Sequence, residues 1–168
     1  IIEGLGIPDI DCEGRYIEVR FGNLSVVSVY LPSGSSGEHR QAAKFAFMGH
    51  FRPHLETLFK SGREVVVCGD WNIAHTAKDI KNAKGNVKNS GFLPEERAWI
   101  GDLLGKLGWV DVYRTLYPEA EGEGYTWWSN RGQAWAKNVG WRIDYQIATP
   151  GVSATAKSAS VYKDARFS

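Results

Sequence analysis

The sequence of 168 residues has little of several features that would assign a protein to a class at once. It contains two cysteines, and Cys68 lies inside an apolar run, where a thiol behaves as a small hydrophobe, so a disulfide framework is not expected. Neither sign of charge is in excess, because twenty Lys and Arg against nineteen Asp and Glu give a formal net charge of +1. That balance argues against a strongly basic nucleic-acid binder, and any polyanionic partner would have to contact a local patch.

A long hydrophobic run is also missing. No apolar segment approaches the roughly 20 residues that span a bilayer, and the first residues, IIEGLGIPDI, lack the basic start of a signal peptide. We therefore expect a soluble protein of the reducing cytoplasm, without a membrane partner.

Several motifs of nucleotide and acyl chemistry are missing as well. The sequence has no P-loop, no dinucleotide-binding fingerprint and no nucleophile elbow. These absences argue against NTP hydrolysis, hydride transfer and acyl transfer. Phosphodiester chemistry assisted by a metal remains.

The sequence does have the composition of one globular domain, with 43% hydrophobic and 12% aromatic residues over residues 1–168. Alternating β-rich runs predict antiparallel strands at residues 16–21 and 24–30, joined by a hairpin at Gly22 and Asn23. Apolar spacing predicts helices over residues 41–60, interrupted at Pro53, and over residues 94–107. A short buried strand at 64–68 and a polar loop at 76–91 lie between them. The mixed order of elements favours a single α/β or α+β domain.

The stretch VVVCGDWNIAH, residues 65–75, places an acid and an amide directly after the buried strand. If strand alternation continues, Asp70 and Asn72 point to the same side, at the strand end where α/β sheets bind ligands. Such a pair can hold a metal ion, orient a water molecule or contact a phosphate. Asp and Asn after a glycine also cap ordinary turns, so the stretch alone leaves both interpretations open.

A second acid, Asp144, lies in the strand-like run WRIDYQIAT. Arg142 and Asp144 would share one face of this strand. An aspartate among apolar neighbours is costly to bury unless it has a partner. Taken alone, a structural ion pair with Arg142 or another base is the simpler explanation.

Aromatic residues are dense between residues 125 and 145, where cations and amides alternate with them. Such mixed surfaces suit stacking on bases or sugars and contact with phosphates. The alternative is that most of these tryptophans fill a core, as alternation predicts for at least Trp128. The tryptophans concerned are Trp127, Trp128, Trp135 and Trp141.

Four segments together resemble one family. The segments GDWNIA (69–74), NSGFLPEER (89–97), YTWWS (125–129) and KNVGWRIDY (137–145) closely resemble exonuclease III type abasic-site endonucleases, of the endonuclease/exonuclease/phosphatase superfamily. The resemblance covers nearly the whole chain. It implies a four-layered α/β sandwich of two mainly antiparallel sheets flanked by helices.

The activity that the resemblance implies is hydrolysis of the phosphodiester 5′ to abasic sites in double-stranded DNA, with Mg²⁺ or Mn²⁺ as cofactor. Many members also have 3′-to-5′ exonuclease or 3′-phosphatase activity, so 3′-blocked ends are expected substrates too. We expect a monomeric, nucleoid-associated protein.

The resemblance also implies catalytic roles for four residues. Asp70 would align or deprotonate the attacking water, and Asn72 would steady the phosphate and the nucleophile. The hydroxyl of Tyr30 would lie near the scissile phosphate. Asp144 would orient a catalytic histidine.

Six further residues match positions that contact or support DNA in the family. Three of them would build the apolar pocket for a base-free deoxyribose, which is cheap to flip out of the helix because it has no base to unstack: Trp127, Trp141 and Ile143. The others lie in segments that resemble DNA-contacting or site-supporting loops: Asn86, Asn89 and Asn138.

The sequence departs from the family at both ends. The family's first asparagine-bearing strand and its metal-binding glutamate have no counterpart, and the chain stops at Ser168, which resembles the serine of the terminal Ser-Asp-His-Ala-Pro. We therefore expect an incomplete domain, lacking its N-terminal portion and last strand, that does not cleave DNA by itself. The metal ligands stay unknown. Two rivals remain: another phosphoesterase of the superfamily, or a non-catalytic DNA-binding fragment.

Overall fold

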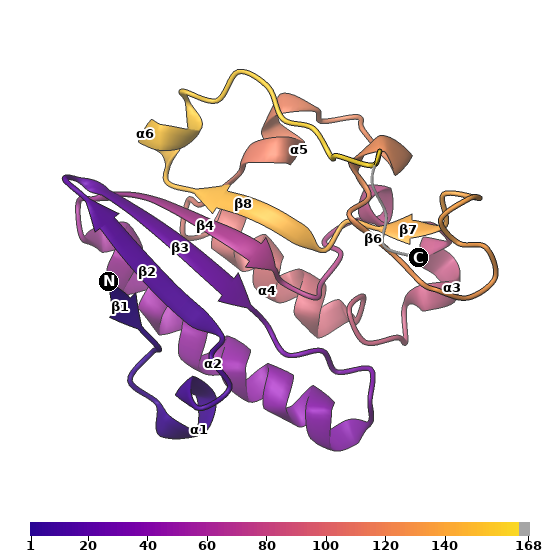
Figure 1. Cartoon of the computed structure of the whole chain (residues 1–168), viewed down its shortest axis with the longest axis horizontal. Helices are drawn as coiled ribbons and strands as arrows, with labels where there is room; N and C mark the ends of the chain where they lie inside the picture. Colours follow the sequence, from indigo (N-terminus) through magenta and orange to yellow (C-terminus); the bar gives the residue numbers. More distant parts are fainter. Residues whose placement is uncertain (165–168) are drawn as a thin grey trace.

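The computed structural model describes residues 1–164, which fold around one six-stranded sheet (Figure 1). Its strand order is β1-β2-β3-β4-β8-β5, and a second sheet pairs β6 with β7. Only β3 and β4 run parallel among the paired strands of these residues. Ser168 lies outside the described residues. The strands are β1 (Ile2–Glu3), β2 (Tyr16–Phe21), β3 (Leu24–Tyr30), β4 (Glu64–Asp70), β5 (Val110–Asp111), β6 (Trp127–Trp128), β7 (Gly140–Trp141) and β8 (Asp144–Ala148).

The predicted hairpin is confirmed, because β2 and β3 pair antiparallel from Phe21 and Leu24 at the turn to Tyr16 and Val29. The buried strand predicted at 64–68 is also confirmed, but it continues to Asp70. The extension arises because both neighbours of β4 reach as far, with Tyr30 and Asp144 opposite Asp70.

Two long helices cover one face of the large sheet (Figure 1): α2 (Glu38–Lys60) and α4 (Pro94–Gly105). Their apolar residues and the odd-numbered residues of β3 and β4, such as Val27 and Val67, form the main core. The helix predicted from residue 94 is confirmed, with Pro94 in its first turn.

The prediction that Pro53 interrupts the first helix is wrong. Pro53 lies inside a continuous α2 of 23 residues. Proline removes one helical hydrogen bond, but burial of Phe51 and Leu55 on either side of it holds the helix against the sheet.

Short elements connect these parts. The predicted loop over 76–91 contains two of them, η1 and α3. The Thr76 side chain caps η1 by accepting the Lys78 N–H, and the Asp79 side chain accepts the Thr76 N–H. The short elements are α1 (Pro8–Asp11), η1 (Ala77–Asp79), α3 (Ala83–Asn86), α5 (Val112–Leu116), η2 (Gly122–Gly124) and α6 (Pro150–Ser153).

The small sheet corrects one prediction about the tryptophans. Trp128 was expected in a core, but it is only partly buried and belongs to neither buried cluster. Its ring packs against Trp135 with centroids 4.4 Å apart, and its Nε1 donates to Asn138 Oδ1. The alternation itself holds, since Trp127 is the more exposed of the two, but the surrounding loop covers too little of Trp128 to bury it.

The arrangement confirms the predicted α/β class: a main sheet, a second small sheet and flanking helices. The two faces of the main sheet differ, because the even-numbered residues of β3, β4 and β8 face away from α2 and α4 and, except for Ala148, are more exposed. Among the described residues, no helix combines the length and apolar character that a membrane crossing requires.

Candidate active site

Three predicted catalytic residues form a row across the open face of the sheet. Asp70 ends β4, and its register partners are Tyr30 on β3 and Asp144 on β8. Because the three positions are directly opposite one another on adjacent strands, their side chains emerge on the same face and at the same end. The sheet therefore brings together residues 40 and 74 positions apart from Asp70 (70 minus 30, and 144 minus 70).

Asp70 lies in an environment that disfavours its charge. Burial, with a contribution from the negative charge of Asp144, raises the pKa of its carboxyl to about 6, against the lowering effects of the Asn72 backbone N–H and the charge of Lys44. The Asn72 N–H donates to Asp70 Oδ1 at 2.8 Å. Asp70 therefore caps a turn and also keeps a carboxylate that can accept a proton near neutral pH.

Because the pKa of Asp70 is raised, we expect the free energy of unfolding to depend on pH through this group. The measurement is made in EDTA, so that no bound metal ion contributes. Between pH 3.8 and about pH 6 the folded state holds a proton that unfolded Asp70 has lost, so this group favours folding at low pH and opposes it as the pH rises. Relative to the native sequence, Asp70→Asn should gain about 1–3 kcal/mol of unfolding free energy between pH 4 and pH 7. Urea unfolding of both proteins at the two pH values measures it, and a difference that does not change with pH would contradict the assignment.

Asn72 departs from the alternation that the sequence suggested. Its φ is 52°, in the left-handed region, so the strand geometry ends at Asp70 and no longer fixes where the Asn72 side chain points. Its Nδ2 donates to the Leu31 carbonyl at 2.9 Å, and its side chain lines a cavity beside the row rather than the sheet face.

Asp144 is not paired with Arg142, and that part of the sequence analysis is wrong. Arg142 precedes β8 and is buried in ion pairs with Asp79 and Asp111, whereas Asp144 is exposed, although both residues line the same cavity on the open face. Partial desolvation raises the pKa of Asp144, and the hydroxyl of Thr126 opposes that shift. Thr126 Oγ1 also accepts the N–H groups of Ile143 and Asp144, at 3.1 and 3.2 Å, and so fixes the start of β8.

A cavity of about 470 Å³ adjoins the row. Segments 33–37 and 88–91 contribute small and polar residues to its walls. Trp127 and Trp141 lie opposite each other in the small sheet, with ring centroids 6.3 Å apart and planes at 88°. Five residues named from the sequence line it: Asn72, Asn89, Trp127, Trp141 and Ile143.

Asn86 and Asn138 lie outside this cavity. The Oδ1 of Asn86 accepts from Asn89 Nδ2 at 2.8 Å, so Asn86 restricts the side chain of Asn89, which lines the cavity. Asn138 has a φ of 49° and links the loop between β6 and β7 to β6 and to η2, because it accepts from Trp128 Nε1 and donates to the Gly122 carbonyl.

A larger cavity of about 710 Å³ lies on the same open face, between the sheet and residues 152–162. Asp144, Cys68 and Gln146 are among its lining residues. Asp144 is the residue of the row that lines the larger cavity, whereas the smaller cavity is where aromatic rings and amides converge.

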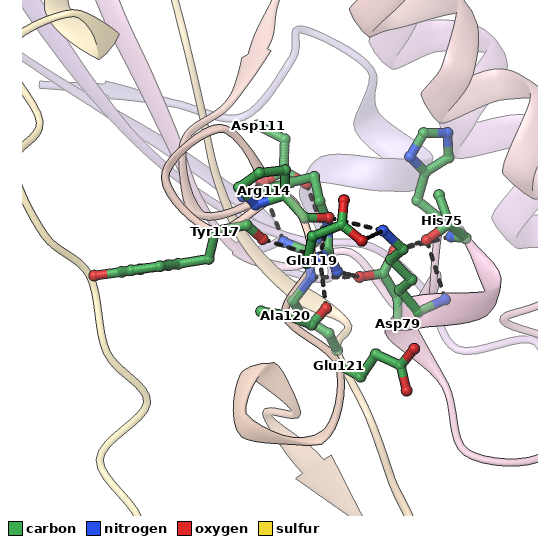
Figure 2. A network of polar contacts seen from close by, with 12 residues as sticks. His75, Asp79, Asp111, Arg114, Tyr117, Glu119, Ala120 and Glu121 are labelled. Carbon is green, nitrogen blue, oxygen red and sulfur yellow. Dashed lines mark hydrogen bonds and ion pairs between the residues drawn. The ribbon is translucent and has the colours of Figure 1, made fainter.

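A buried ionic network holds the short segment between Trp141 and Asp144, through Arg142. The guanidinium of Arg142 binds both oxygens of Asp111, at 3.0 and 2.6 Å, and Asp79 Oδ1 at 2.7 Å. Arg114 reaches the same Asp79 oxygen at 2.6 Å (Figure 2). Burial alone would lower the pKa of Arg142, but Tyr145, Asp111 and Asp79 raise it above its ordinary value.

Residues that the sequence analysis did not single out complete the site. Thr126 lies inside the YTWWS segment, where it is the residue between aromatics that can accept a hydrogen bond from the backbone of β8. Lys44 donates to the Asn72 carbonyl from α2, and its signal was a lone cation in the apolar run AAKFAF. The third, Glu96, pairs with Lys44, although its position in a first helical turn suggested only a favourable dipole interaction.

Sequence comparison identifies the group to which this chain is related. Residues 2–165 match the model of the Endonuclease/Exonuclease/phosphatase family. Exodeoxyribonuclease of Bacillus subtilis (strain 168) is 36% identical over 164 residues, which are 98% of this chain and 64% of that protein. DNA repair nuclease APEX1 of Danio rerio is 42% identical over 144 residues, which are 86% of this chain and 46% of that protein.

Solved structures agree with the sequence relatives. A 3′ phosphatase from Neisseria, bound to a product DNA hairpin, matches with a TM-score of 0.85 and 25% identity over 94% of this chain and 60% of its own. The chain spans from 46% to 64% of the length of these three relatives. Because the family match extends over almost all of its residues, this chain belongs to the endonuclease/exonuclease/phosphatase family.

Proposed function

We propose that this chain is part of a metal-dependent DNA-repair nuclease of the exonuclease III type, which hydrolyses the phosphodiester 5′ to abasic sites in duplex DNA. The observation that carries the proposal is the row of Tyr30, Asp70 and Asp144 beside a cavity lined by Trp127 and Trp141. The row supplies acid–base groups, and the cavity has the aromatic walls that a flipped sugar would contact.

In this proposal Asp70 accepts a proton from the attacking water or aligns it in line with the phosphate. Its pKa of about 6 suits that task, because the carboxyl is mostly ionised at neutral pH and still basic enough to take a proton. Asn72 and Tyr30 contact the phosphate, and Asp144 orients a histidine. The rate gain comes from fixing water and phosphate in one geometry.

The proposed cofactor is Mg²⁺ or Mn²⁺. Among residues 1–164 no group of three or more His, Cys, Asp or Glu could hold a metal ion. Asp70 and Asp144 are register partners whose carboxyl groups emerge on one face of the sheet, and such a pair would suit Mg²⁺, which takes one or two carboxylates and completes its shell with phosphate oxygens and water. When bound, the ion supplies positive charge to the phosphate and the leaving oxygen.

We also propose 3′-phosphatase or 3′-to-5′ exonuclease activity at the same site, with 3′-blocked ends as substrates. The specific support is the structural match to the Neisseria 3′ phosphatase. The two rivals, another phosphoesterase of the superfamily or a DNA-binding module without catalysis, make different predictions for a substrate panel. A phosphoesterase for small molecules would not prefer DNA, and a binding module would bind abasic DNA without cleaving it.

Replacing the exposed ring of Trp127 tests the proposed substrate pocket. Trp127→Ala should weaken binding to a duplex with one abasic analogue by about 1–3 kcal/mol, or roughly 5- to 150-fold, because an aromatic face is lost. Fluorescence anisotropy in EDTA measures it without cleavage.

Phe21→Ala is the matched control, since Phe21 is an exposed aromatic ring at the far end of β2, with 61% of its surface accessible against 45% for Trp127. It should change affinity less than twofold. Equal losses in the two variants, or equal affinity of the native chain for abasic and undamaged duplex, would contradict the proposed pocket.

A further inference from the structure

Lys44 on α2 and Glu96 on α4 form an ion pair in the interior. Lys44 Nζ lies 2.7 Å from Glu96 Oε1, and both side chains have no exposed surface. Removing two charges from water is costly, and apolar residues of similar volume can fill such a place at no loss of stability. The two helices already share an apolar core, so holding them together does not explain the pair.

Three further hydrogen bonds of the pair go to backbone groups near the cavity. Lys44 Nζ donates to the Asn72 carbonyl at 2.7 Å. Glu96 Oε2 accepts the N–H groups of Gly91, at 2.7 Å, and Leu93, at 3.1 Å. One ion pair therefore binds the turn after β4 and the turn before α4.

These two turns form adjacent walls of the cavity. Gly91 has a φ of 92°, and a β-carbon there would lie 3.0 Å from the Trp141 ring and 3.1 Å from the Asn72 carbonyl oxygen. The two turns also bind each other, because the Ala74 N–H donates to the Gly91 carbonyl at 2.8 Å. A small displacement of either turn would close or widen the cavity.

A third wall of the cavity is linked to the same Lys44–Glu96 ion pair, through Gln41. Gln41 Nε2 donates to Glu96 Oε1 at 3.0 Å, and Gly34 packs so closely on Gln41 and Ser90 that a β-carbon at Gly34 would collide with both side chains. Gly34 and Ser90 line the cavity. The pair thus contacts, directly or through Gln41, three separate chain segments that form walls of the cavity.

We infer that Lys44 and Glu96 are positioning residues, which set the turns that carry Asn72 and Asn89–Gly91 at the distance the substrate requires. They do not touch the substrate, and they act through backbone groups that sequence alone does not orient. The DNA part of this inference rests on the proposed function; the positioning of the turns does not.

The test compares Lys44→Met, the apolar double variant Lys44→Met with Glu96→Leu, and Leu55→Ala as control. Leu55 is fully buried on the same helix, eleven residues or about 16 Å from Lys44. Amide hydrogen exchange by NMR reports order at Phe92 and Ala74, whose hydrogen-bond acceptors remain in all variants, against Val67 in β4 as the global reference.

We expect the double variant to lose less unfolding stability than Lys44→Met, because it leaves no buried carboxylate without a counter-charge. Gly91 and Leu93 still lose their acceptor, so Phe92 and Ala74 should exchange at least tenfold faster relative to Val67. The affinity of the double variant for an abasic duplex should fall about tenfold or more. Leu55→Ala should speed exchange at all three amides alike and leave affinity within about twofold.

Two results would overturn the inference: native-like exchange at Phe92 and Ala74 in the double variant, or selective loosening of the same amides in Leu55→Ala. A native chain that does not bind DNA would instead refute the proposed function. In that case the exchange rates alone decide the inference, and selective loosening in the double variant supports it.

Discussion

Asp70→Asn is expected to reduce cleavage of an abasic duplex by the whole protein about 10²- to 10⁴-fold, the contribution typical of a positioned acid–base group. Asparagine keeps the oxygen that accepts the Asn72 N–H at 2.8 Å, so the turn after β4 is preserved while the proton acceptor is lost. DNA affinity should stay within a few fold. Single-turnover cleavage with excess enzyme, alongside anisotropy, separates the two quantities.

Asp9→Asn is the control for this measurement, because Asp9 is an exposed aspartate in α1, away from both cavities. It removes the same charge and should leave cleavage unchanged. If Asp70→Asn cleaves at more than a tenth of the native rate, Asp70 is not the group that handles the proton. If both cleavage and affinity fall together, Asp70 acts in binding.

Arg142→Met is expected to lower the unfolding free energy by about 3–5 kcal/mol, because it leaves buried carboxylates without their main counter-charge. Asp79 has no exposed surface and Asp111 has 4%, so neither can recover its hydration without opening the structure. The guanidinium of Arg114 pairs with Asp79 and not with Asp111, which keeps the Arg114 backbone N–H but loses its cation. Urea unfolding followed by tryptophan fluorescence gives the value.

The control substitution is Arg52→Met, which breaks ion pairs of Arg52 with Glu56 and Asp102 at the surface, at 3.4 Å each. Exposed pairs contribute about 0–1 kcal/mol, so this variant should remain close to native stability. A loss below about 1 kcal/mol in Arg142→Met would mean that the network is not needed to hold the segment between Trp141 and Asp144.

Local features of the chain were well predicted from the sequence. The hairpin at Gly22 and Asn23, the start of α4 at Pro94 and the strand before Asp70 are each specified by a few adjacent residues, through turn chemistry, a fixed proline φ or a β-branched apolar run. The same applies to the motifs behind the family resemblance, which the family match confirms. Roles of individual site residues remain predictions.

The errors have a common cause, which is that local rules omit packing. Pro53 breaks an isolated helix but not one whose two sides are held in a core. Trp128 follows the alternation of a strand, yet β6 has only one partner strand, so nothing covers it fully. An ion pair of Arg142 with Asp144 was the simpler explanation while both were assumed to lie in one strand, but β8 begins after Arg142, and its guanidinium pairs with Asp79 and Asp111 instead.

By itself, the sequence determined the type of each main element, the residue types available for phosphodiester chemistry and the family. The tertiary structure decided which of these residues meet. Strand register placed Tyr30 and Asp144 beside Asp70, and the buried charges of Lys44, Glu96 and Arg142 fixed the turns around the cavity. The reason is physical: register and burial depend on contacts between segments tens of residues apart, and no local propensity contains that information.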